Sequence, residues 1–158
     1  GSLMAISDHI NWSGYNPLIG KNQDEYGPRF HDMSDGYHKF YRDQLLEVAN
    51  KTNQKIFEGI YCMYSGPNFE TPAEINALKV IGGNAVGMST VPEVLVANHC
   101  NLSVIAISVI TNLAAGMNKT KLSHKETLEN ASLAEENILQ LIKNFITEVT
   151  FDDSSGNN

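Results

Sequence analysis

The sequence predicts an α/β protein in which helices flank a mixed, largely parallel β-sheet. Apolar strand-like runs alternate with helix-like runs along the chain, which is typical of α/β layer folds. Two of the strand-like runs, at 55–64 and 103–110, are apolar on both faces, as strands in the interior of a parallel sheet are. A chain of 158 residues suits one domain, which we place at 1–150, and we expect a disordered polar tail at 151–158.

A long loop separates the elements in the first part of the chain. We expect a short strand at 3–6, no regular structure at 8–34, and a helix at 35–50, where apolar residues recur at helical spacing. Loops beyond about 12–15 residues are uncommon inside compact domains and are usually functional. The aromatic residues of this loop are Trp12, Tyr15, Tyr26 and Phe30. Because aromatic rings need a surface to pack on, we expect the loop to contact something rather than to project freely into solvent.

Three capping boxes mark helix starts in the second part of the chain. In a capping box, a Ser or Thr is followed three residues later by Glu, and each side chain accepts a hydrogen bond from the other residue's backbone. The three pairs are Thr71 with Glu74, Thr90 with Glu93, and Ser123 with Glu126. We expect the first helix to stop at 82–83, the second to run to 100, and the third to reach the tail. A short buried strand is expected at 85–88, and the three helices are expected to cover the sheet.

Composition excludes several classes of partner. The formal net charge is −7, and Lys and Arg are not clustered, so a nucleic-acid partner is not expected. No apolar run approaches the roughly 20 residues that span a bilayer, and the opening residues show no secretory signal, so neither a membrane segment nor export is expected. Cys62 and Cys100 have no metal-binding or redox spacing. We interpret them as free core thiols of a protein from a reducing, cytoplasmic compartment.

Residues that could form a binding site stand at strand ends or helix starts. They are Phe69 with Glu70, Met88 with Ser89, Asn112, and His124. Each of these residues could instead have a purely structural role. Glu70 could favour a helix start through its charge, Met88 could fill the core, Ser89 could form a turn, Asn112 could end a strand, and His124 could be an exposed residue of a first helical turn. Together, a carboxylate, an amide, an aromatic ring and a thioether suit a pocket for a flat heterocycle with polar edges. Ser89, beside a helix start, is suited to hold part of an anion.

Several motifs resemble, in order and spacing, the carboxyl-terminal half of trimeric purine nucleoside phosphorylases. The resemblance covers nearly the whole chain up to about Val149. The motifs are Asp8-His9-Ile10-Asn11, Gly27-Pro28-Arg29-Phe30, Met33-Ser34-Asp35, Gly66-Pro67-Asn68-Phe69-Glu70-Thr71, Val86-Gly87-Met88-Ser89-Thr90-Val91-Pro92-Glu93, Ile110-Thr111-Asn112 and Ser123-His124 with Glu126. Members of this family cleave the glycosidic bond of purine nucleosides with inorganic phosphate, so the resemblance implies a pentosyltransferase of purine salvage.

The resemblance also implies a role for each candidate residue. Glu70 would accept hydrogen bonds from purine N1–H and, in guanine, from the 2-amino group. Asn112 would accept from N7–H and donate toward O6, which stabilises the departing base. The remaining contacts would come from Phe69, Val86, Gly87 and Met88 around the base and ribose, His124 on the 5′-hydroxyl, Ser89 on phosphate, and Phe30 from a neighbouring subunit of a homotrimer. No metal or cofactor is implied, because phosphate is the co-substrate.

Two features of the resemblance bear on substrate and completeness. Methylthioadenosine phosphorylases are similar but carry aspartate at the position of Asn112. The amide therefore favours inosine and guanosine, and His124 agrees with a 5′-hydroxyl. Family members are about twice as long, and their first half carries a Gly-Ser-Gly-type phosphate loop, further phosphate ligands and a tyrosine on the ribose. A chain that binds purine or only assembles, without catalysis, is therefore the alternative hypothesis, and a methylthioadenosine phosphorylase is a further one.

Overall fold

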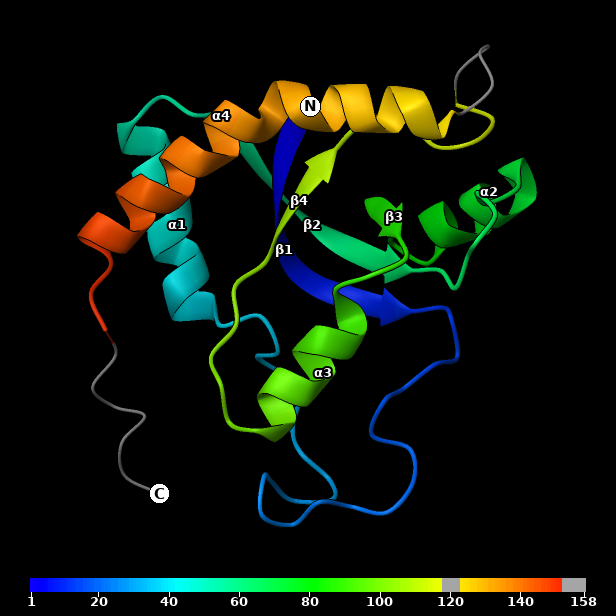
Figure 1. Ribbon diagram of the computed structural model, residues 1–158, viewed down its shortest axis with the longest axis vertical. Helices are drawn as coiled ribbons and strands as arrows, with labels where there is room; N and C mark the ends of the chain where they lie inside the picture. Colours follow the sequence, from blue (N-terminus) through cyan, green and yellow to red (C-terminus); the bar gives the residue numbers. More distant parts are fainter. Residues whose placement is uncertain (118–122, 152–158) are drawn as a thin grey trace.

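The computed structural model describes residues 1–117 and 123–151, apart from the side chains of residues 124 and 126. The elements in this part of the chain are β1 (Ser2–Asn11), α1 (Lys39–Lys51), β2 (Ile56–Met63), α2 (Pro72–Val80), β3 (Ala85–Gly87), α3 (Val91–His99), β4 (Ile107–Ile110) and α4 (His124–Glu148) (Figure 1). The expected tail at 151–158 lies, beyond its first residue, outside the described residues.

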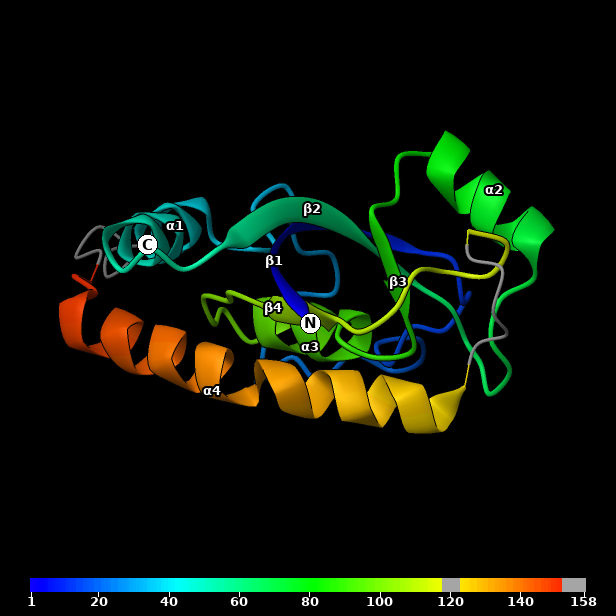
Figure 2. The same ribbon diagram turned by 90° about the horizontal axis from the view of Figure 1, so that it is seen from above.

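The strands form one mixed sheet in the order β3-β2-β1-β4. β2 pairs in parallel with both β1 and β3, whereas β4 pairs antiparallel with β1. The predicted fold class, a mixed and largely parallel sheet flanked by helices, is therefore confirmed. In both views α1 and α2 lie toward opposite ends of the molecule, and the long helix α4 runs beside the amino terminus (Figures 1 and 2).

Alternating side chains of β1 divide the core into two layers. Leu3 and Ala5 pack with buried residues of α1 and α4. Met4 and Ile6 face the other way and pack with buried residues of α3. Such alternation follows from the two-residue period of a strand. A third cluster joins α2 to Cys62 of β2. Helix α2 therefore covers a part of the sheet that is not covered by α1 and α4.

A bulge in β1 changes which of its side chains face α3. The register pairs Ile6 with Gly59 but Asp8 with Ile60, so β1 has one extra residue at this point. Side chains after the bulge exchange faces, which brings His9 to the face of Met4 and Ile6. There His9 Nδ1 lies 2.9 Å from the hydroxyl of Tyr37, and burial lowers the pKa of His9.

Several predicted boundaries of the elements were wrong. β1 continues through 8–11, which we had assigned to the loop, because these polar residues still pair with β2. α1 begins at Lys39 rather than at 35: Tyr37 is 2% exposed in the core against α3, and the Asp35 carboxylate accepts from the Lys39 backbone N–H at 2.8 Å. Regular pairing of β4 begins at Ile107, although the Ala106 carbonyl accepts from the Ile6 N–H at 2.9 Å.

Only the first of the three predicted capping boxes is confirmed. The Thr71 hydroxyl accepts from the Glu74 N–H at 3.3 Å, and the Glu74 carboxylate accepts from the Thr71 N–H at 2.7 Å. Thr90 precedes α3 with φ 75° and ψ −52°, a conformation in which its side chain makes no capping bond. Ser123 also makes no side-chain capping bond within the described part of the chain, and the side chain of its partner at 126 is not described.

Both cysteines are free, as predicted: Cys62 is fully buried and Cys100 partly buried. Burial raises the pKa of the Cys62 thiol, which keeps it protonated at neutral pH. Of the helices in the described residues, none has the combined length and hydropathy of a membrane-spanning segment.

Candidate functional site

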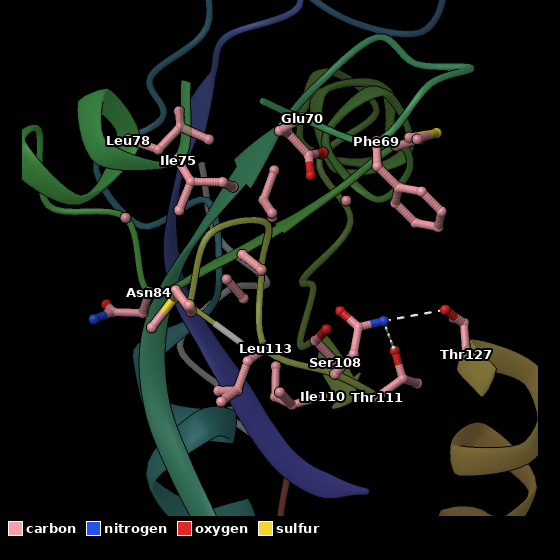
Figure 3. A pocket seen from close by; sticks show the side chains of 18 of the residues that line it. Phe69, Glu70, Ile75, Leu78, Asn84, Ser108, Ile110, Thr111, Leu113 and Thr127 are labelled. Carbon is pink, nitrogen blue, oxygen red and sulfur yellow. Dashed lines mark hydrogen bonds between the residues drawn. The ribbon is translucent and has the colours of Figure 1, made fainter. Parts of the chain in front are cut away.

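The candidate site is a cavity of about 300 Å³ whose walls come from both edges of the sheet. Residues 85–88, in and after β3, line one wall, and residues 108–114, in and after β4, line the other (Figure 3). Ile75 and Leu78 of α2 add apolar surface. Since β3 and β4 are the two outermost strands of the sheet, both can line one cavity only because the sheet curls.

Six of the predicted site residues line this cavity. They are Phe69, Glu70, Val86, Gly87, Met88 and Asn112. We expected them to meet because the carboxyl ends of parallel strands share one edge. That reason holds for the segments after β2 and β3, but β4 is antiparallel, and its last residue, Ile110, pairs with Ser2 at the start of β1. Asn112 reaches the cavity instead because the chain after β4 runs along it.

The segment between β2 and α2 reaches the cavity through a close backbone approach. Gly66 has φ 65°, a conformation that favours glycine, and a Cβ atom there would lie 2.4 Å from the Met88 sulfur, so a larger residue would be strained and would displace the Met88 side chain. The capping box of Thr71 and Glu74 then fixes the start of α2. Glu70, immediately before the N-cap, is thereby held at the cavity wall.

Glu70 is a buried carboxylate without a protein partner. It is 6% exposed, and within the described part of the chain it makes no hydrogen bond or ion pair. It is not needed as a capping residue, since Glu74 fills that role. Figure 3 shows its oxygens turned toward the cavity. A carboxylate that lines a cavity and has no protein partner there has its acceptor oxygens available, so the position suits a ligand that brings hydrogen-bond donors.

Asn112 is held by two threonines. Its amide nitrogen donates to the Thr111 hydroxyl at 3.2 Å and to the Thr127 hydroxyl at 3.1 Å (Figure 3). Thr127 belongs to the first turn of α4, so this contact joins the cavity wall to that helix. The side-chain oxygen of Asn112 has no partner among the described residues. No local pattern singles out Thr127 before the structure is known, because its contact with Asn112 spans 15 residues.

The turn between β3 and α3 is strained beside the cavity. Thr90 is a β-branched residue with φ 75°, a combination that costs on the order of 1–3 kcal/mol. The Tyr61 hydroxyl holds the turn by accepting from the Ser89 N–H at 3.3 Å. A Cβ atom on Gly87 would lie 2.2 Å from that hydroxyl, so glycine is required there. Ser89 itself stands next to the cavity residue Met88 but is not part of the cavity lining as described.

Besides Ser89, two further predicted site residues cannot be placed at the cavity. The side chain of His124 lies outside the described residues, although α4 begins at this position. Phe30 lies in the long loop, is 90% exposed, and does not line the described cavity. The other aromatic residues of the loop are also exposed, Tyr15 at 57% and Tyr26 at 60%. The expected packing surface for these rings is therefore not supplied by the described residues of this chain.

Comparisons with known proteins agree on one family. The family model described as the phosphorylase superfamily matches residues 1–147. Purine nucleoside phosphorylase 1 of Geobacillus stearothermophilus is 48% identical over 143 residues, which are 90% of this chain and 52% of the relative. The mouse (Mus musculus) purine nucleoside phosphorylase is 40% identical over 160 residues, which are 97% of this chain and 55% of the relative.

A solved structure gives the same result. The Schistosoma mansoni purine nucleoside phosphorylase in complex with inosine superimposes with a TM-score of 0.90 at 34% identity, covering 96% of this chain and 56% of the other. This chain thus spans about half the length of the curated relatives that it matches.

Proposed function

Since the chain belongs to the phosphorylase superfamily, we propose that its activity is the phosphorolysis of 6-oxopurine ribonucleosides and deoxyribonucleosides such as inosine and guanosine. The products are the free base and ribose or deoxyribose 1-phosphate. A phosphate oxygen forms a bond to C1′, the bond between C1′ and N9 breaks, and its electron pair goes to the purine, which takes up a proton. The substrate class is supported by related structures solved with inosine, guanosine and hypoxanthine.

The unpartnered, buried carboxylate of Glu70 carries this proposal. A 6-oxopurine has a hydrogen on N1, and guanine adds a 2-amino group, so both present donors to a carboxylate on one edge of the ring. Adenine has a bare nitrogen at N1 and would leave Glu70 without that donor. The apolar walls around Ile75 and Leu78 suit the faces of the flat ring system.

Asn112 would act on the opposite edge of the base. As the glycosidic bond breaks, negative charge accumulates on the purine and a proton is taken up at N7. An oxygen acceptor that meets N7–H stabilises the departing base more than the intact nucleoside, which is the condition for lowering the barrier. Ser89 would bind phosphate beside the start of α3, and His124 would hold the 5′-hydroxyl. Phe69 and Met88 would flank the base and ribose.

A second candidate is a protein that binds purine without turning nucleoside over; the described cavity presents acceptors for a base, whereas Ser89, the residue assigned to phosphate, is not among its lining residues. The two candidates are separated by measuring phosphate-dependent release of hypoxanthine from inosine, and by calorimetric titration with hypoxanthine. Release that depends on phosphate supports phosphorolysis. Binding without release supports the second candidate. Neither release nor binding would refute both, and a preference for methylthioadenosine over inosine would refute the assigned substrate class.

We further propose a homotrimer in which Phe30 of one subunit reaches the ribose pocket of the next, without a metal or other cofactor, in the cytoplasm. Support comes from the exposed aromatic rings of the long loop and from the two free cysteines, which suit a reducing compartment. Sedimentation velocity tests the assembly, and a monomer at working concentration would refute it. Substitution of Phe30 by Ala should then raise the KM for inosine while purine binding is retained.

A further inference from the structure

We propose that Thr127 is a positioning residue that fixes which end of the Asn112 amide meets the ligand. An amide side chain can turn by 180° and exchange its donor and acceptor ends with little change in shape. The chemistry of the cavity depends on which end faces it. The purine ligand named below rests on the function proposed above. The orientation of the Asn112 amide does not, because it follows from contacts within the chain.

The single proton of the Thr127 hydroxyl is already committed. Its oxygen donates to the backbone carbonyl of Ser123 at 3.1 Å, a bond from residue i to residue i−4 in the first turn of α4. A hydroxyl has one proton and two lone pairs, so toward Asn112 it can only accept. The group of Asn112 that lies 3.1 Å away must therefore be the NH₂ end.

Both hydrogens of the Asn112 amide are then used within the protein. One goes to Thr127 and the other to the Thr111 hydroxyl. The oxygen of the amide is left as the end available to a ligand. This differs from our expectation that Asn112 also donates toward purine O6, because no N–H of the amide remains for that bond while both threonines are engaged.

With the amide held in this way, two of the polar side chains that line the cavity, Glu70 and Asn112, present acceptor oxygens to a ligand that brings donors. In an intact 6-oxopurine nucleoside N7 carries a lone pair, which would face the Asn112 oxygen unfavourably. After N7 takes up a proton from water as the base departs, the same oxygen accepts a hydrogen bond. Thr127 would therefore favour the departing base over the bound substrate.

A merely structural role for Thr127 predicts a different outcome. Its bond to Ser123 could serve only to hold the first turn of α4. Thr147, near the other end of the same helix, makes an equivalent bond to the Lys143 carbonyl at 2.9 Å and contacts neither Asn112 nor the cavity. Thr147→Val is therefore a matched control for Thr127→Val.

The test compares two nucleosides whose hydrogen-bonding groups differ only at N7, which accepts a hydrogen bond in one and donates it in the other. Inosine has a lone pair at N7, whereas 9-deazainosine has N7–H and the same sugar. Calorimetric titration of the full chain with each gives a ratio of affinities. We expect the wild-type chain to prefer 9-deazainosine. Thr127→Val should reduce this preference by at least about fivefold, the value of one ordinary hydrogen bond, because the amide becomes free to turn. Thr127→Ser and Thr147→Val should retain it.

The outcomes separate this inference from the function on which it rests. If the wild-type chain binds the pair and Thr127→Val keeps the wild-type ratio, the positioning role is refuted while the proposed function stands. If no purine or purine nucleoside binds to any variant, both are refuted. Should Thr127→Val fail to fold, as judged by circular dichroism, Thr127→Ala provides the same loss of an acceptor. Where turnover is measurable, the variant should lower kcat more than it raises KM.

Discussion

Replacing Glu70 with Gln should weaken purine binding and leave the stability of the empty chain little changed. Glu70 is 6% exposed and has no partner in the described part of the chain. Gln has nearly the same shape, so the substitution breaks no contact among the described residues. We expect Glu70→Gln to unfold like the wild-type chain in the absence of ligand and to bind guanine and hypoxanthine more weakly. A residue with a purely structural role would lose stability together with binding.

The size of each effect can be worked from the burial and the expected contacts. A substitution that breaks no contact within the protein changes the free energy of unfolding by about 0.5 kcal/mol or less, which in a chain of this length corresponds to about 1–2 °C in Tm. A hydrogen bond to a charged group is worth about 1.5–3 kcal/mol, which is about a 10- to 150-fold loss of affinity. Guanine, with two donors on this edge, should lose more than hypoxanthine, with one.

Differential scanning calorimetry and isothermal titration measure the two effects on the same samples. Glu93→Gln is the matched control, because Glu93 is exposed in the first turn of α3 and does not line the cavity. It should change the affinity by less than about twofold, since surface substitutions alter free energies by about 0.5 kcal/mol or less. An unchanged affinity in Glu70→Gln, or a Tm lower by more than about 2 °C in the absence of ligand, would refute the reasoning about Glu70.

Three further predictions concern other parts of the chain. Asn112→Asp should shift binding toward adenine over hypoxanthine, because a carboxylate accepts from a 6-amino group; an unchanged ratio in calorimetric titration counts against the use of Asn112 to assign the substrate class. Thr71→Ala should lower the free energy of unfolding in urea by about 1 kcal/mol through loss of the capping box, and an unchanged free energy of unfolding would contradict the role of the cap. Burial lowers the pKa of His9 in the folded state, so the unfolded chain binds more protons below about pH 6.5, and stability falls as the pH drops through that range. His9→Gln should flatten this slope in urea unfolding between about pH 7.5 and 5.5, and a slope equal to that of the wild-type chain would contradict the assignment.

Features that depend on local chemistry could be predicted from the sequence. The Thr71 capping box forms because both partners lie within one helical turn. The last residues of β2 are apolar on both faces because different parts of the chain pack on the two sides: Tyr61 and Met63 face the core with α3, and Cys62 faces α2. The segments that follow β2 and β3 meet because parallel neighbours end at the same edge of the sheet.

Features that depend on contacts between residues distant in the sequence could not be predicted in this way. The Thr90 pattern reads as a capping box, but the turn takes a positive φ beside the Tyr61 hydroxyl, which lies 28 residues before Ser89 in the sequence. The antiparallel direction of β4 leaves no mark in its own residues. Thr127 is unremarkable in its helix and matters only because the chain after β4 passes it at hydrogen-bonding distance.

The central claim, that Glu70 and Asn112 bind opposite edges of one purine, is tested most directly by a crystal structure of the chain with guanine. We predict the base in the cavity between β3, β4 and α2, with N1–H and the 2-amino group on the Glu70 carboxylate and N7–H on the side-chain oxygen of Asn112. A base bound elsewhere, or bound in this cavity with either of the two side chains out of hydrogen-bonding distance, would contradict the claim.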